Sequence, residues 1–522
     1  MILLVKIWSV DWFAGLSLFR RQVAGFPSPE VYPSFLKDTL KDTLNNAPEP
    51  ATPMGPRAAE SAIGCRIVAP ESYALKAAYA LETLLRPLGL GLDQGGTSGI
   101  WYGPVAPTGG NWLFVRMDPE TPLRITSSLR DSALPGIAGD LAPSLFPGGL
   151  TLPGGSGQES GDIIASAFYW LAGCDETYNE PRDRHGRPVG RDSLLHTMGL
   201  AETAPVDAYR EMLANALEAG GQSLPRRSWK GASWCFCPTF DIDYLRKWRP
   251  GIIYRELIQN FLLGRGPKPR GARLRSGLRQ WLFRRDPYRT AISRMALEVE
   301  KVQGAGTFFF KGGASGPHDV RYSLQGGFIQ RTFRALRAAG HDIGLHPSYH
   351  AFNHGGYLAS EHQRLTTASG GAIHTVRTHY LRWDPPATPR NFAANGLVLD
   401  SSLGFADTPG FRNGTCLPFQ TWDHDLNATS GIWEMPLAMM ESAMFNREGL
   451  TSAQAIEQGG QLLRTVQQYG GVLVALWHNV LWDEPDFAGW GDHFLAMLRT
   501  ASAGGGAILP LAEALRGWGS EQ

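Results

Sequence analysis

Cysteine, excess charge and long apolar runs are all scarce in this chain of 522 residues. Its five cysteines, an odd number, argue against a disulfide framework and fit a reducing compartment. The 49 Lys+Arg and 48 Asp+Glu leave a formal net charge of +1, so the overall charge indicates no nucleic-acid partner. A membrane-spanning helix needs about 20 consecutive apolar residues, and we predict no such helix.

The apolar amino end, residues 1–19, lacks the order of a secretory signal. Lys6 and Asp11 interrupt it. The basic pair Arg20-Arg21 follows the apolar part, whereas a signal peptide has its positive charge first and a small-residue cleavage site last. We therefore predict a cytoplasmic protein.

The composition is that of a folded protein, with 43% hydrophobic and 19% charged residues. The length exceeds what one hydrophobic core usually organises, so two domains are expected. Prolines and small residues between 45 and 61 predict a linker. We predict an amino-terminal extension over 1–60, a smaller α/β domain over 61–228 and a second domain over 229–522.

Strands alternate with helices in the second domain, which favours parallel strands with helical crossovers. The fold class predicted from this alternation is α/β, either a barrel or an open sheet. The strands are expected at 234–243, 306–310, 342–346, 396–400, 431–435 and 471–478, with helices at 330–339 and 453–469. In the first domain we expect helices at 73–88, 162–171 and 205–217, a strand at 111–115, and mostly loop over 135–161.

A basic segment departs from this plan. Residues 265–289, within a predicted insertion at 250–300, hold nine Lys/Arg against the single acid Asp286. Leucines and Trp281 are interleaved with the charges. Two interpretations stay open: a solvated insertion, or a basic amphipathic segment that touches an anionic membrane surface or a lipid-linked sugar phosphate.

The strongest local motif is Thr239-Phe240-Asp241-Ile242-Asp243. Side chains alternate along a strand, so Asp241 and Asp243 share one face about 6–7 Å apart. This spacing suits one carboxylate that binds a metal and one beside it. An alternative is two acidic residues where a strand meets a loop.

The second motif is His346-Pro347-Ser348-Tyr349-His350, which follows a short apolar strand. Proline suits the first position of a helix, and residues four apart are neighbours on a helix face. His346 and His350 therefore form a candidate metal-ligand pair. Pro347 stands where a metalloprotease would place its glutamate base, so the base must come from elsewhere, with Asp241 as the candidate.

The third motif ends another apolar strand with Trp477, His478 and Asn479. A buried strand does not normally finish in this way unless the polar residues have partners. Each of the three motifs lies at the carboxyl end of a predicted parallel strand, where the active sites of α/β barrels gather. Eleven of the 13 histidines also lie after residue 300.

In this order the three motifs resemble the first, second and fifth motifs of the polysaccharide deacetylases of the NodB-homology type, carbohydrate esterase family 4. The resemblance covers just over half the chain and implies a distorted (β/α) barrel. It implies that Asp241 is the general base and His478 the general acid. It also implies that Asp243, His346 and His350 hold one divalent metal.

Arg377-Thr378-His379-Tyr380 resembles the third motif of that family, Arg-x-Pro-Tyr, whose arginine orients the base; here His379 replaces the proline. Arg382 and Arg412 are alternatives for the arginine. Asp400-Ser401-Ser402 resembles the fourth motif. Candidate substrate-binding residues are Arg382, Arg412, Trp477 and Asn479.

The resemblance extends to the amino-terminal region. Residues 162–171 and 185–187 look like the uncharacterised domain that precedes this catalytic domain in a bacterial subgroup thought to act in surface-polysaccharide assembly. The implied activity is metal-dependent hydrolysis of N-acetyl or O-acetyl groups of a sugar or polysaccharide. Zinc is the first choice of metal, and cobalt, nickel or manganese also suit these ligands.

Two alternatives to this activity stay open. One is a catalytically silent carbohydrate-binding protein, although binding alone requires neither a base nor an acid. The other is a metal-dependent hydrolase of a non-sugar amide.

Overall fold

The computed structural model describes residues 61–130, 143–152, 157–158, 161–178, 182–248, 278, 286–447 and 449–518. All of them belong to one compact unit, which contains two β-sheets. The predicted extension over 1–60 and nearly all of the basic segment up to residue 285 lie outside the described residues. The domain boundary near residue 228 stays a prediction.

The first sheet has six strands in the order β2-β1-β3-β4-β5-β6. Its first four strands are parallel and its last two antiparallel. The strands are β1 (Ser61–Ile67), β2 (Leu90–Asp93), β3 (Gly99–Gly103), β4 (Trp112–Met117), β5 (Gly148–Thr151) and β6 (Gly157–Gln158). The helices of this region are α2 (Glu71–Leu85), α3 (Thr121–Arg124), α4 (Ile163–Leu171), α5 (Cys174–Tyr178), α6 (Leu194–Thr197) and α7 (Pro205–Ala219).

Helix α4 lies at the centre of the first core. All nine of its residues are buried, and Asp162 caps its first turn by accepting hydrogen bonds from the N–H groups of Ile164 and Ala165. An N-cap of this kind satisfies donors that the helix itself leaves free. The predicted helices over 73–88, 162–171 and 205–217 are thus confirmed as α2 with the short turn after it, α4 and α7.

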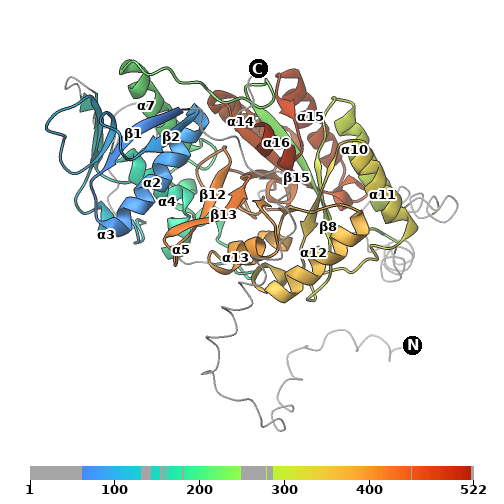
Figure 1. The fold of residues 1–522 in the computed structure, drawn as a ribbon. Helices are drawn as coiled ribbons and strands as arrows, with labels where there is room; N and C mark the ends of the chain where they lie inside the picture. The colour runs from blue at the N-terminus through green and yellow to red at the C-terminus, as the bar shows by residue number, and fades with distance from the viewer. Residues whose placement is uncertain are drawn as a thin grey trace, which may run out of the picture. The chain divides into compact units, whose positions relative to one another are not determined.

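The second sheet has ten strands, with the path β12-β13-β11-β10-β9-β8-β7-β15-β14 and β16 beside β7. All its pairings are parallel except that of β12 with β13. The strands are β7 (Cys235–Ile242), β8 (Thr307–Lys311), β9 (Asp342–His346), β10 (Thr375–Val376), β11 (Leu399–Asp400), β12 (Phe419–Asp423), β13 (Ala428–Glu434), β14 (Leu437–Met440), β15 (Val472–His478) and β16 (Ala507–Ile508). The helices are α10 (Pro287–Glu300), α11 (Gly327–Ala338), α12 (Gly355–Ser369), α13 (Ala387–Ala394), α14 (Ser452–Tyr469), α15 (Trp490–Ala503) and α16 (Leu511–Gly517), and Figure 1 shows several of them around the sheet.

The second sheet is curled. β13 pairs with β11 near one end of the strand order, and β14, which begins three residues after β13 ends, pairs with β15 at the other end. The segment formed by β13 and β14, interrupted at Met435 and Pro436, therefore pairs with strands near both ends of the strand order. The predicted α/β class is confirmed: the carboxyl-terminal region is a curled half-barrel of mostly parallel strands, preceded by a smaller α/β sheet.

Strand β7 lies in the middle of the curled sheet, between β8 and β15. All eight of its residues are buried, including both cysteines. A strand covered on both faces brings its carboxyl end to the centre of the sheet edge, where its acidic residues meet those of its neighbours.

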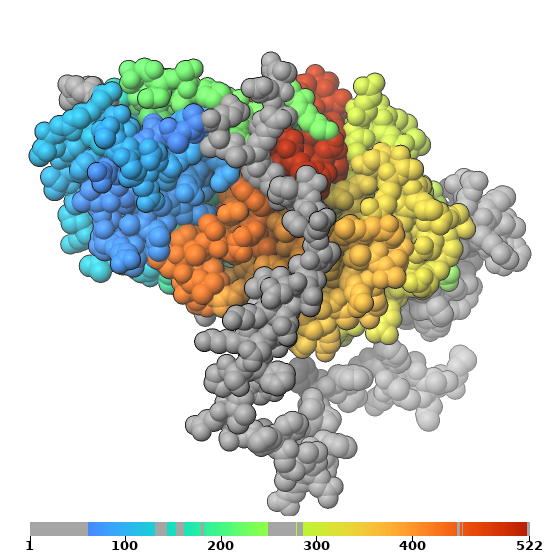
Figure 2. Space-filling view, viewed as in Figure 1, coloured from blue at the N-terminus to red at the C-terminus, as the bar shows by residue number. Residues whose placement is uncertain are grey.

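The two sheets share apolar packing. Trp422 of β12 lies 5.3 Å from Phe168 of α4 and 4.9 Å from Tyr79 of α2, measured between ring centroids. In Figure 2 the surface of the blue amino-terminal residues adjoins that of the orange β12–β13 hairpin. Across the described ranges, no helix combines the length and hydropathy needed to cross a bilayer.

Candidate metal and catalytic site

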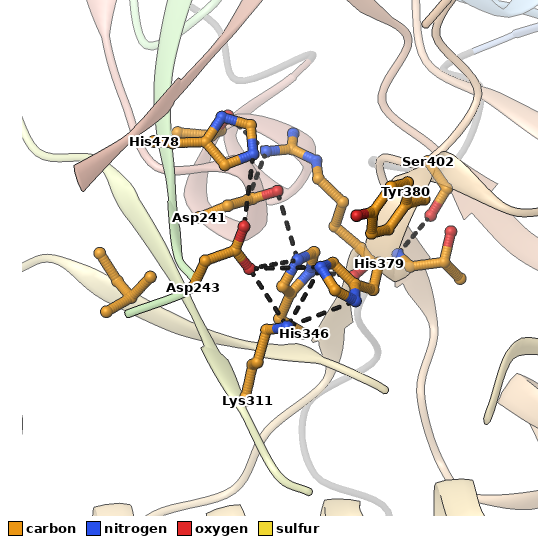
Figure 3. Close-up of polar contacts among 12 residues, drawn as sticks. Asp241, Asp243, Lys311, His346, His379, Tyr380, Ser402 and His478 are labelled. Atoms are coloured by element: carbon orange, nitrogen blue, oxygen red, sulfur yellow. Dashed lines mark hydrogen bonds and ion pairs between the residues drawn. The ribbon is translucent and has the colours of Figure 1, made fainter. Parts of the chain in front are cut away.

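Four neighbouring strands deliver polar side chains to one edge of the curled sheet. Asp241 lies near the end of β7, His346 ends β9 and His478 ends β15; Asp243 directly follows β7 and Lys311 ends β8. The register aligns His478 with Asp241 and Lys311 with His346. These side chains line a pocket of about 300 Å³ (Figure 3). The predicted meeting of the first, second and fifth motifs is therefore seen in the structure.

Three residues that could hold a metal ion lie together in this pocket and form a candidate metal-binding group: Asp243, His346 and His379. One ligand atom from each lies within 4.8 Å of the others. The Oδ1 atom of Asp243 is 3.4 Å from Nε2 of His346 and 3.6 Å from Nε2 of His379. One carboxylate and two imidazoles are a donor set that zinc and other divalent transition metals accept.

Hydrogen bonds orient both imidazoles of this group. Nδ1 of His346 donates to the backbone carbonyl of Arg377 at 2.7 Å, and Nδ1 of His379 donates to Asp319 at 2.8 Å. Burial lowers the pKa of His379 to about 4, so its ring is neutral at pH 7. The His379 ring therefore carries its lone pair on Nε2, and in both rings the bond from Nδ1 leaves Nε2 for the pocket, as in metal sites where an outer carbonyl or carboxylate orients the ring.

Two of the three ligand atoms have no hydrogen bond. Asp243 Oδ1 and His346 Nε2 are both buried without one. A buried polar atom left unsatisfied costs about 1–3 kcal/mol, and proteins seldom retain such atoms without a reason. These atoms face each other in the pocket, so the residues present fit a divalent metal.

Lys311 lies beside the same group and is itself buried. Its ammonium is 3.4 Å from Asp243 Oδ1, 3.6 Å from Asp319 Oδ1 and 3.1 Å from Nε2 of His379. Burial alone would raise the pKa of Asp243, but Lys311 and the two imidazoles hold it well below its usual range. Asp243 is therefore ionised, as a metal ligand must be.

Asp241 is held by the arginine that the third motif predicted. Arg377 is completely buried, and its Nη1 donates to Asp241 at 3.3 Å and to the hydroxyl of Thr239 at 2.7 Å. Its Nε and Nη2 donate to the carbonyl and hydroxyl of Ser401, both at 2.8 Å. The guanidinium is thus fixed from two sides and fixes one oxygen of Asp241.

His478 is paired with Glu441. Its Nδ1 contacts the Glu441 carboxylate, and its Nε2 is 3.8 Å from Asp243 Oδ2. Burial alone would lower the pKa of His478, but Glu441, together with Asp243 and Asp241, raises it to about 10. His478 is therefore protonated at pH 7 and can donate from Nε2 into the pocket.

The structure places His350 outside the metal-binding group. Its ring lies edge-on to that of Tyr349, and its backbone N–H donates to Ser315. Our prediction required a helical turn after His346, but residues 347–350 form a loop, and the next α-helix begins only at Gly355. His379 occupies the position expected of His350.

The four candidate substrate-binding residues lie outside the lining of this pocket. The guanidinium of Arg382 lies between the rings of Tyr349 and Phe352, and Arg412 forms a two-bond ion pair with Glu176. Trp477 is buried, with its ring stacked on that of His493. The Asn479 amide donates to the carbonyls of Tyr244 and Tyr288. Their contacts are those of packing and loop anchoring.

Sequence reasoning missed the partners of the site: Lys311, Asp319 and Glu441. Lys311 and Glu441 each follow a run of apolar strand residues, which is the signal that identified His346 and His478. Asp319 lies in a loop and has no such signal. Its role becomes visible only through its hydrogen bond to His379.

The amino-terminal region supplies one wall of the pocket through Arg184, His185 and Arg187. Arg187 is buried and paired with Asp183, and its Nη1 donates to the carbonyl of Tyr380 at 2.8 Å. Tyr380 has φ of 64° and the next residue 55°, a conformation costly for residues other than glycine. Arg187 therefore contacts the strained turn that carries His379.

Comparisons with known proteins find different relatives for two parts of the chain. Residues 137–221 match a family of unknown function, DUF7033. No curated protein matches the sequence. The carboxyl-terminal half is similar to solved structures of family 4 carbohydrate esterases, at low identity.

A protein from Mycobacterium smegmatis described as a polysaccharide deacetylase is 18% identical, over 55% of this chain and 91% of that one, with a TM-score of 0.37. A family 4 carbohydrate esterase from Streptomyces lividans, solved with acetate, is 13% identical over 53% and 92% of the two chains, with a TM-score of 0.27. A family 4 pseudoenzyme from Bacillus anthracis is 10% identical over 56% and 68%, with a TM-score of 0.27. The chain is thus similar to deacetylases and to a relative called a pseudoenzyme.

Proposed function

We propose that this chain is a metal-dependent deacetylase that hydrolyses N-acetyl or O-acetyl groups of a sugar. One observation carries the proposal. The Asp243, His346 and His379 group lies in the same pocket as a carboxylate fixed by an arginine and a histidine held protonated by a glutamate. Metal-dependent hydrolysis of an amide or ester uses a metal site, a base and an acid together, whereas sugar binding requires none of them.

Asp243, His346 and His379 would hold one divalent metal, with zinc the first choice. When bound, such a metal lowers the pKa of a water ligand towards about 7 and polarises an acyl oxygen. The rings of His346 and His379, each fixed through Nδ1, would present Nε2 for this purpose, with Lys311 lying 3.1 Å from Nε2 of His379.

Asp241 acts as the general base. Arg377 holds its Oδ1, and its Oδ2 lies 3.6 Å from Nε2 of His346, beside the metal-binding group. In this position the carboxylate accepts the proton of a water that attacks the acetyl carbon. The buried guanidinium of Arg377 fixes the direction of this carboxylate through its hydrogen bond.

His478 acts as the general acid. Glu441 binds Nδ1, which leaves the Nε2 proton directed into the pocket. His478 then donates this proton to the departing sugar amine or alcohol. Acid and base lie on neighbouring strands in register, so they approach the acetyl group from adjacent positions.

The test measures bound metal and released acetate for the wild type and for Asp241→Asn. Both proteins are expected to bind one divalent ion, since Asp241 is not a ligand. Acetate release from acetylated oligosaccharides should fall about 10²–10⁴-fold in the variant, the usual contribution of a general base. Metal bound by both proteins with no acetate from a broad sugar panel would contradict the deacetylase and favour a silent binding protein or a non-sugar amide.

A further inference from the structure

A second cavity lies next to the catalytic pocket. It has a volume of about 560 Å³ and shares Tyr244 with the catalytic pocket. One wall follows the first motif, at Tyr244 to Arg246, and the other runs from Val320 to Arg331 around the start of α11. The two pockets are therefore neighbours, and both lie beyond the carboxyl ends of β7 and β8.

The lining of the second cavity is basic, and the nearby acid Asp286, which is not part of the lining, only partly offsets the charge of Arg289. Four arginines line it, and none of its other lining residues is Asp or Glu. Across the described residues no carboxylate forms an ion pair with any of the four. The arginines are Arg246, Arg289, Arg321 and Arg331.

Two of these arginines are close enough for their positive charges to interact. Arg289 is held in place, because its Nε donates to the carbonyl of Leu245 at 3.1 Å and its guanidinium lies 4.6 Å from the ring centre of Phe328. Burial and the positive charge of Arg246 lower the pKa of Arg289. An anion between them would reverse this repulsion and use the remaining guanidinium donors.

Backbone donors add to the same wall. Gly326, the N-cap of α11, has no side chain to satisfy the first turn of the helix, and Gly326, Gly327 and Phe328 all line the cavity. Free N–H groups at the start of a helix favour an anion in addition to the arginines.

We propose that this cavity binds a phosphate or pyrophosphate group, and that the substrate of the adjacent pocket is an acetylated sugar that carries such a group. The proposal rests on the deacetylase function proposed above. Planar arginines suit phosphate because two parallel N–H groups match two of its oxygens. The volume accommodates a pyrophosphate, and the shared Tyr244 places the sugar beyond it in the catalytic pocket.

The first test measures binding of inorganic pyrophosphate to the full chain by calorimetry, at low salt and with a chelator present so that no metal contributes. The double variant Arg246→Gln/Arg321→Gln should bind at least tenfold more weakly than the wild type. Arg334→Gln is the matched control, since Arg334 is an exposed arginine of α11 that does not line the cavity. Equal affinity of the wild type and the double variant would overturn the proposal, as would equal weakening by the control.

The second test measures acetate release with three acetylated substrates: a neutral oligosaccharide, a nucleoside-diphosphate sugar and a lipid-linked sugar pyrophosphate. The double variant should raise KM at least tenfold for the wild type's preferred pyrophosphate substrate and leave kcat/KM for the neutral one unchanged. The lower KM of the two pyrophosphates identifies the source of the group. Equal loss on the neutral substrate would overturn the proposal.

The two tests separate the proposals from each other. Pyrophosphate binding that depends on Arg246 and Arg321, without acetate from any substrate, would support the anion site and contradict the deacetylase. Acetate release without such binding would support the deacetylase and contradict the anion site. Because both arginines are exposed, the double variant should fold normally, which its thermal unfolding checks.

Discussion

Two buried carboxylates differ in their hydrogen bonds: both oxygens of Asp162 in the amino-terminal region accept one, whereas Oδ1 of Asp243 in the catalytic pocket accepts none. In the amino-terminal sheet region, Asp162 accepts hydrogen bonds from the N–H groups of Ile164 and Ala165 and from the hydroxyl of Tyr102. At the edge of the curled sheet, Asp243 Oδ1 and His346 Nε2 are buried with no hydrogen bond.

This contrast distinguishes buried carboxylates that hold the fold together from those that are available to a ligand. Asp207 of α7 accepts from the hydroxyl of Thr415 and the N–H of Cys416, and pairs with Arg210 at 3.2 Å. This carboxylate joins the amino-terminal helix to a loop of the curled-sheet region, and both of its oxygens have partners. Where partners are complete, substitution should affect stability; where they are missing, it should affect ligand binding.

Asp207→Ala is expected to have the largest effect. The change removes the bonds to Thr415 and Cys416 and one of the two carboxylate partners of buried Arg210, which keeps Glu211 at 2.9 Å. Breaking a buried pair costs about 3–5 kcal/mol, and Glu211 places the expected loss at about 3 kcal/mol. The free energy of unfolding, measured by urea denaturation, should fall by that amount. A loss below about 1 kcal/mol would show that the junction does not depend on this carboxylate.

His379→Ala tests whether the candidate group of Asp243, His346 and His379 binds a metal. Loss of one of three protein ligands should weaken zinc binding by more than the roughly 10–100-fold that loss of an outer-shell partner costs. His350→Ala is the matched control, because His350 is exposed and outside the group, and its affinity should equal that of the wild type. Calorimetric titration with zinc measures the affinity of both variants. Weaker binding by His350→Ala than by His379→Ala would identify His350 as the ligand instead.

Arg187→Ala tests whether the amino-terminal region supports the metal-binding group. Each residue held at positive φ stores about 1–3 kcal/mol, and Arg187 donates to the strained turn at Tyr380 that follows His379. Relaxation of that turn should weaken zinc binding about tenfold while the fold remains intact. Unchanged affinity would mean that the turn holds its shape without this contact.

The smallest expected effect is the change in the free energy of unfolding per pH unit. Burial raises the pKa of Asp162 from 3.8 to about 7 in the folded protein. A raised carboxyl pKa means that the folded state favours the neutral form. The contribution to stability is therefore fully present below about pH 4 and declines as the pH rises through 7, at no more than about 1.4 kcal/mol per pH unit.

Asp162→Asn should remove this decline, since an amide does not ionise and its oxygen can still cap α4. Urea denaturation between pH 4 and 8 compares the two proteins. Parallel curves would show that Asp162 titrates with an ordinary pKa.

The comparison also explains what could be predicted from the sequence. Asp241, His346 and His478 were identified because each interrupts an apolar strand pattern near its carboxyl end, and parallel strands bring such ends together. The same pattern predicted β7, β9 and β15 to within a residue or two. Arg377 was identified only through resemblance to a family motif.

His379 was missed as a ligand because its position depends on a turn with positive φ at Tyr380 and Leu381, a conformation that no periodicity signals. His350 was chosen instead because Pro347 suits a helix start, whereas the chain forms a loop and begins α12 only at Gly355. The contribution of Arg187 depends on a contact between residues far apart in the chain, which a single sequence does not reveal.

The central claim is that deacetylation requires a metal ion held by Asp243, His346 and His379. The most direct measurement is acetate release by the full chain after chelation and then after stepwise return of zinc. We expect release to stop on chelation and to recover fully at one equivalent of zinc. Release that continues unchanged in the chelator would contradict the claim.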